Sequence, residues 1–271
     1  MNTDNTSELA LYATNVAGLR HYDASFSRLY FGNEFCQHLI PPANDLAQAL
    51  DFASEHSLAF TLVTPYVTDE GLRMLEPHLR EVETRKPGSE VVFNDWGTFQ
   101  VLTEGHPNLE PVMGRLLHKM KRGPRFMNLT DILPESTVNY FRSCSLDVPL
   151  YRRFLLAWGI RRVELDNLLQ GISLDFSNSG MSGSLYLPYA YVTTTRLCLA
   201  ASCDVSGREK EVGILPCQKE CQKYTFQLRH PVMPLPLIRK GNTIFFKNEN
   251  MPEQIAERNI NRIVVEPEVP L

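Results

Sequence analysis

Three closely spaced cysteines are the residues in this sequence whose type and spacing best suit chemistry. Cys198 precedes Cys217 by nineteen positions, and three residues separate Cys217 from Cys221. Thiolate sulfurs are soft donors that bind iron, and four of them are the usual protein ligands of a 4Fe-4S cluster. A pair separated by three residues can reach two corners of one cluster from a single turn. The spacing therefore favours an iron-sulfur cluster.

Zinc is the main alternative metal for these thiols. Structural zinc sites more often contain cysteine pairs separated by two residues, and no pair of histidines lies nearby in this sequence. A third interpretation is plain packing, because a lone cysteine is usually a small buried hydrophobic residue. That interpretation fits the isolated Cys144 better than it fits the segment from Cys198 to Cys221.

The overall composition is ordinary for a globular protein. The 271 residues are 43% hydrophobic and 21% charged, with a formal net charge of −4. This negative charge makes nucleic acid an unlikely main partner. The first eight residues lack the features of a secretory signal, and no apolar run suggests a membrane span. We expect a cytoplasmic protein, in which clustered cysteines bind metal more often than they form disulfides.

Short runs rich in Val, Ile, Leu, Phe and Tyr alternate with amphipathic segments, and such runs suit strands buried on both faces. The expected strands are Leu9–Thr14, Arg28–Phe31, Ala59–Thr64, Glu90–Phe93, Arg162–Leu165, Ser184–Leu187, Thr243–Lys247 and Arg262–Val265. The expected helices are Asp45–Glu55 capped by Asn44, Asp69–Glu83 capped by Thr68, Leu109–Lys121, and Tyr151–Gly159 with Phe154, Leu155 and Trp158 on one side. Pro77 should kink or split the second helix.

This alternation predicts an α/β fold with a parallel sheet. We expect a (β/α) TIM-barrel-like single domain over residues 1–271, complete or slightly irregular, ahead of an open doubly wound sheet. No dinucleotide, Walker, nucleophile-elbow or His-Glu-x-x-His motif is present. No serine or cysteine has a recognisable histidine partner, so peptidase activity is not expected.

Longer segments around the cysteines resemble a known family. They comprise Leu185-Tyr-Leu-Pro-Tyr-Ala-Tyr-Val-Thr-Thr-Thr-Arg-Leu-Cys198, Pro-Cys217-Gln-Lys-Glu-Cys221, Leu29-Tyr-Phe-Gly-Asn-Glu-Phe-Cys36, Glu90-Val-Val-Phe-Asn-Asp95-Trp-Gly97 and Arg162-Val-Glu164-Leu. In this order they resemble the U-thirty-two (collagenase-type) peptidase family. Within it, they are most similar to the V-type subunit of the anaerobic ubiquinone-biosynthesis hydroxylase branch.

The resemblance implies a barrel-like domain with an oxygen-sensitive 4Fe-4S cluster. Its ligands, one early cysteine and three later ones, correspond here to Cys36, Cys198, Cys217 and Cys221. Cys36 lies just beyond the C-terminal end of an expected strand, where barrel enzymes place their sites. Cys203 is an additional thiol and an alternative ligand within the binding segment 198–221.

The function that the resemblance implies is oxygen-independent hydroxylation or related redox chemistry, with prephenate or an aromatic small molecule as substrate. The chain would act as an enzyme or as a partner subunit. One alternative is a non-catalytic, cluster-bearing partner in a heterodimer with a related larger family member. Another is RNA modification, whose only support is the basic run from His118 to Arg125, although basic residues that close a helix are usually solvated.

Residues near the ends of expected strands are the catalytic candidates. Asp95 could accept a proton, or it could cap the following helix. Glu164 lies inside a strand, where a charged group is either paired or functional. Arg196 could bind a substrate carboxylate or cluster sulfurs, or it could be simply exposed. Tyr189 and Tyr191 could line an aromatic pocket, although alternating tyrosines are more often part of a sheet face.

Overall fold

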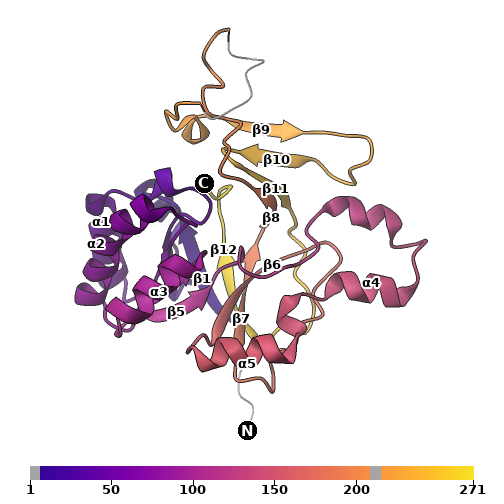
Figure 1. The fold of residues 1–271 in the computed structure, drawn as a ribbon, viewed down its shortest axis with the longest axis horizontal. Coiled ribbons are helices and arrows are strands. Elements are labelled where there is room, and N and C mark those ends of the chain that lie inside the picture. Colours follow the sequence, from indigo (N-terminus) through magenta and orange to yellow (C-terminus); the bar gives the residue numbers. More distant parts are fainter. Residues whose placement is uncertain (1–6, 208–214) are drawn as a thin grey trace.

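Eight parallel strands form a closed barrel in the computed structural model, which describes residues 7–207 and 215–271 (Figure 1). Around the barrel the order is β1-β12-β7-β6-β5-β4-β3-β2. The strands are β1 Glu8–Ala13, β2 Arg28–Gly32, β3 Ala59–Val63, β4 Glu90–Phe93, β5 Glu110–Met113, β6 Arg162–Asp166, β7 Ser182–Leu187 and β12 Ile260–Val265. The predicted TIM-barrel-like fold is thus confirmed, and the open doubly wound sheet is wrong.

Side chains on alternate positions of the strands fill the barrel or face its outer layer. Three tyrosines, Tyr12, Tyr30 and Tyr186, meet inside with their rings edge to face, with centroids 6.0 to 6.5 Å apart. Smaller residues such as Ala10 and Val264 complete the same interior layer. This mixture of large and small side chains closes the interior, so the barrel is a packed core.

Helices flank the barrel, with α4 set off to one side (Figure 1). They are α1 Ala43–Glu55, α2 Asp69–Arg85, α3 Trp96–Gly105, α4 Glu135–Arg142 and α5 Pro149–Ala157. Thr68 caps α2 as predicted, because its side chain accepts from the Gly71 N–H. Asn44 does not cap α1, because the helix already begins at Ala43. No helix in the described part of the chain is long and apolar enough to cross a membrane.

Two other helix predictions differ from the structure. The helix α2 continues through Pro77 and is not split. The segment predicted as a helix over Leu109–Lys121 forms β5 and then a loop. Val112 packs inside the barrel while Met113 packs in the outer core, so the two residues face opposite ways as in a strand. Pairing with β4 and β6 overrides the helical spacing of the apolar residues.

The barrel is irregular in its second half. Residues 167–181, all described, connect β6 to β7 without a helix. Between β7 and β12 the chain builds an antiparallel sheet of order β8-β11-β10-β9. Its strands are β8 Tyr189–Thr194, β9 Thr225–Leu228, β10 Leu237–Lys240 and β11 Thr243–Lys247. In Figure 1 this sheet rises from the end of the barrel near the C-terminus. The segment predicted at Thr243–Lys247 is therefore a strand, but it belongs to this second sheet.

Candidate functional site

Four cysteine side chains converge at the mouth of the barrel. Cys36, Cys198, Cys217 and Cys221 line one cavity of about 80 Å³. Cys36 follows the C-terminal end of β2, and the other three lie in the connection between β8 and β9. Although 162 positions separate Cys36 from Cys198, the fold brings them together where the second sheet meets the barrel.

The turn between β10 and β11 holds two of these segments in place. Asn242 donates hydrogen bonds from Nδ2 to the Phe35 carbonyl at 2.7 Å and to the Thr195 carbonyl at 2.8 Å. It therefore links the residue before Cys36 to the segment that leads to Cys198. The preceding Gly241 has a φ of +56°, and a Cβ there would lie 3.1 Å from the Cys221 Cβ. A side chain at position 241 would thus crowd the cavity as well as strain the backbone.

Burial raises the pKa of three of these thiols. It raises the pKa of Cys36 to about 11, and the neighbouring Cys221, Cys217 and Cys198 add to this rise. Burial likewise raises the pKa of Cys198 and Cys221. Because metals bind thiolates, any metal that binds here must displace protons.

The donor set suits a soft metal centre. All four groups are thiols, and two of them already accept hydrogen bonds of the kind that tune cluster sulfurs. The Lys219 N–H lies 3.4 Å from the Cys217 Sγ, and the Gln222 amide lies 3.6 Å from the Cys221 Sγ. Among residues 7–207 and 215–271, no three His, Cys, Asp or Glu side chains form a group that could hold a metal ion as they stand. The thiols share a cavity without forming a coordination sphere.

Cys203 is placed apart from the other four cysteines. Its side chain is exposed and does not line the cavity. Cys144 is buried and does not line the cavity. Its Sγ accepts a hydrogen bond from the Leu146 N–H at 3.3 Å. The structure therefore brings together Cys36 and the three later cysteines that the resemblance implies, and it leaves Cys203 outside.

A second cavity of about 80 Å³ adjoins the cysteines and shares Cys36, His38, Arg196 and Asn242 with the first. The remaining lining residues are Phe35, Gln37, Tyr66 and Thr68. Arg196 is exposed, lies over the Tyr66 ring at 5.5 Å and donates to the Val67 carbonyl at 3.1 Å. This lining supplies one cation, several hydrogen-bonding groups and no carboxylate.

Asp95 has a structural role at the start of α3. One carboxylate oxygen accepts the Thr98 N–H at 2.8 Å and so caps α3. The other accepts the Val67 N–H at 3.1 Å and the Thr98 hydroxyl at 2.9 Å. Asp95 lines neither cavity beside the cysteines. Its contacts are those of the helix cap that the sequence left open as an alternative.

Glu164 lies in the interior of the barrel and is fully buried. Its Oε1 accepts from the Tyr30 hydroxyl at 3.1 Å, while Oε2 has no hydrogen-bond partner. Burial raises its pKa to about 7, although the nearby Arg262 and Arg162 oppose the shift. Glu164 also lines neither cavity beside the cysteines.

A buried charge network at the barrel mouth was not predicted. Arg115 is fully buried and forms ion pairs with Glu34, Asp166 and Glu266, all at most 1% exposed. Burial raises the pKa of Glu266 to about 8, although the Arg115 guanidinium opposes this shift. The backbone N–H of Tyr189 donates to Glu266, so the second sheet covers the network. The sequence does contain a signal for this network, because a charged residue lies at or just after the end of several barrel strands.

Tyr191 and Arg122 contact the same buried network, and Tyr189 is half-buried beside it. Tyr191 is buried, and its hydroxyl donates to the Arg115 carbonyl at 3.0 Å. Arg122, the centre of the predicted basic run, is buried and pairs with Asp166 at 2.9 Å. The basic run does not close an α-helix, because residues 118–123 form a loop before a 3-10 helix that begins at Pro124. Lys119, Lys121 and Arg125 are exposed, as expected of a solvated basic run, whereas Arg122 is buried.

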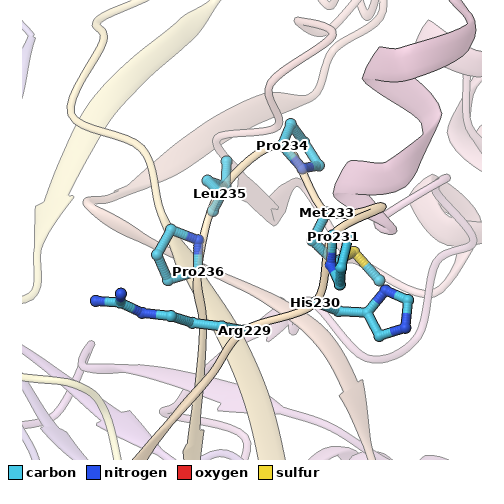
Figure 2. A pocket seen from close by; sticks show the side chains of 7 residues that line it. All are labelled: Arg229, His230, Pro231, Met233, Pro234, Leu235 and Pro236. Atoms are coloured by element: carbon cyan, nitrogen blue, oxygen red, sulfur yellow. The ribbon is translucent and has the colours of Figure 1, made fainter.

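Another, larger cavity lies away from the cysteines. It measures about 560 Å³, and the loop between β9 and β10 lines it with residues 229–231 and 233–236. Figure 2 shows the lining side chains, all from this one loop, with the Arg229 side chain extending away from His230 and Met233. A single loop with a wide opening supplies no convergent set of catalytic groups.

No family model matches this chain, and no curated protein matches it. A solved structure described as that of the U32 peptidase Mk0906 is similar over 100% of this chain and 97% of its own. The TM-score is 0.49 and the sequence identity is 10%.

Proposed function

We propose that this protein binds a 4Fe-4S cluster through Cys36, Cys198, Cys217 and Cys221 and serves in oxygen-independent hydroxylation or related redox chemistry. The observation that carries the proposal is the convergence of these four thiols on one cavity. Four soft donors from two distant segments are the ligand set that such a cluster requires. Zinc is the alternative metal for the same thiols.

The adjoining cavity is the proposed place for a small-molecule substrate. When bound, the cluster would supply one-electron chemistry beside this space. Arg196 would bind a carboxylate such as those of prephenate, since it already faces a cavity without acidic lining residues. The Tyr66 ring offers an aromatic face, and Thr68 and His38 offer hydrogen-bonding groups.

A role as a cluster-bearing partner subunit is the second candidate, because α3 and α5 expose a patch of aromatic side chains. Trp96, Phe154 and Trp158 are 41 to 55% exposed, and their rings contact one another. Of Phe154, Leu155 and Trp158, which the sequence places on one side of a helix, only Leu155 is buried. Exposed apolar patches of this kind mark protein contacts, and the partner would be a related larger chain.

The test is anaerobic purification followed by analysis of iron, acid-labile sulfide and zinc. Replacing any of Cys36, Cys198, Cys217 or Cys221 by serine should remove most of the iron and sulfide. Cys144→Ser is the matched control, because this buried thiol lies outside the cavity, and it should leave the content unchanged. Zinc without sulfide in the wild-type protein would overturn the proposal.

A further inference from the structure

The two turns that carry Cys198 and Cys217–Cys221 are joined by a buried carboxylate. Glu220 is 2% exposed, and its Oε1 accepts the Ser202 N–H at 2.6 Å. Its Oε2 accepts the Gln218 N–H at 3.0 Å. The carboxylate thus bridges the turn after Cys198 and the turn after Cys217.

Ser202 forms a second hydrogen bond between the same two turns. Its hydroxyl donates to the Pro216 carbonyl at 3.0 Å, and its side chain is buried. The backbone at Ser202 has a φ of +59°, a left-handed conformation that costs energy for a non-glycine residue. The Glu220 and Pro216 contacts hold the residue in this conformation. Three hydrogen bonds therefore hold the two turns together: Ser202 N–H to Glu220, Gln218 N–H to Glu220, and the Ser202 hydroxyl to the Pro216 carbonyl. We call this set the clasp.

We infer that Glu220 is a positioning residue, which with Ser202 sets the spacing of Cys198, Cys217 and Cys221 before any metal arrives. Hydrogen bonds from backbone N–H groups to a carboxylate are stronger than neutral ones and fix both partners. The turn is further closed by the Tyr224 N–H, which donates to the Glu220 carbonyl at 2.8 Å. Cys221, the next residue, is thereby held against Gly241.

Electrostatics favour a geometric role over an electronic one. A carboxylate close to thiolates repels them, so Glu220 opposes the negative charge that metal binding requires. A residue at this position that served to activate the thiols would be a cation or a hydrogen-bond donor. The benefit of Glu220 must therefore come from the geometry that its two hydrogen bonds impose.

The inference rests on the proposed function for its purpose, but it can be tested without metal. Dibromobimane becomes fluorescent only after it reacts with two thiols, so it reports thiols that lie close together. In a Cys144→Ser, Cys203→Ser background, the metal-free protein should give cross-links that join Cys198 to Cys217 or Cys221, mapped by mass spectrometry. Glu220→Gln, which keeps one acceptor oxygen and loses the other, should lower this yield by about tenfold, the effect of losing one charged hydrogen bond.

Matched variants separate the outcomes. Glu257→Gln alters an exposed acid and should leave the cross-linking yield unchanged, and Ser202→Ala should give an intermediate loss. Circular dichroism confirms that each variant is folded. Unchanged cross-linking in Glu220→Gln overturns the inference, whatever the metal content. Reduced cross-linking in a protein whose wild type binds no iron would uphold the clasp and overturn the proposed cofactor.

Where the wild type does bind iron, the cluster gives an independent readout. Glu220→Gln should lose iron to a chelator faster than the wild-type protein and Glu257→Gln, with an altered visible absorption spectrum. A variant that retains the wild-type spectrum and rate of iron loss would contradict a positioning role for Glu220.

Discussion

Replacing Glu164 by glutamine should change how the stability of this protein depends on pH. Glu164 is fully buried in the barrel, and one of its carboxylate oxygens has no hydrogen-bond partner. Burial outweighs the nearby Arg262 and Arg162 and raises the carboxyl pKa from 4.5 to about 7. Glutamine has nearly the same shape and can still accept from the Tyr30 hydroxyl, so it mimics the protonated form.

The sign follows from proton release on unfolding. The unfolded chain ionises near pH 4.5, whereas folded Glu164 keeps its proton up to about pH 7, so unfolding releases a proton between these values. The contribution of protonated Glu164 to the free energy of unfolding is therefore fully present below about pH 4.5. This contribution is lost as the pH rises through about 7. At about 1.4 kcal/mol per pH unit, the loss is about 3 kcal/mol.

The assay is urea unfolding of both proteins, with metal-free samples, at intervals from pH 4 to pH 8.5. The free energy of unfolding of Glu164→Gln relative to wild type should rise by about 3 kcal/mol over this range. Other raised carboxyls such as Glu266 contribute equally to both proteins and cancel in the difference. A difference that does not change with pH, or that falls as pH rises, would refute the burial argument.

Three further substitutions have defined outcomes. Arg115→Met should destabilise the protein by about 3–5 kcal/mol in denaturant unfolding, because the buried Glu34 and Glu266 lose their cation and Asp166 keeps only Arg122. A loss below about 1 kcal/mol would contradict this. Asp95→Ala should lower the unfolding free energy by about 1 kcal/mol through loss of the α3 cap, with iron content unchanged; lost iron with an unchanged melting temperature would instead favour a functional Asp95. Cys203→Ser should retain iron and sulfide, because its thiol lies outside the cavity, and their loss would add Cys203 to the ligand set.

The barrel strands could be predicted because their apolar runs are short and continuous. The prediction for Glu90–Phe93 has the observed bounds, and the other predicted barrel strands differ by one or two residues at one end or, for the first strand, at both. The strand β5 was missed, because the apolar residues from Leu109 onward fall at helical spacing. Only the parallel pairing with β4 and β6 shows that Val112 and Met113 face opposite ways. The residues around Leu109 carry no information about these partner strands, so the strand could not be predicted from them.

The candidate site could be predicted only in part, because some of its residues come together only in the fold. Thiol chemistry identified Cys198, Cys217 and Cys221, but spacing alone gives no reason to add Cys36, which comes from a resemblance and lies beside them only through the fold. The Arg115 network was missed because its members come from four strand ends that meet only when the barrel closes. Glu164 and Asp95 were candidates for their charge, and their contacts became known only from the structure.

The central claim is that four thiols brought together by the fold hold an iron-sulfur cluster. The most direct measurement is the iron and acid-labile sulfide content of the anaerobically purified wild-type chain, with Cys36→Ser as the comparison. We expect about four iron and four sulfide per chain in the wild type, and a loss of most of both in the variant. Stoichiometric zinc without sulfide, or an unchanged cluster in Cys36→Ser, would contradict the proposed site.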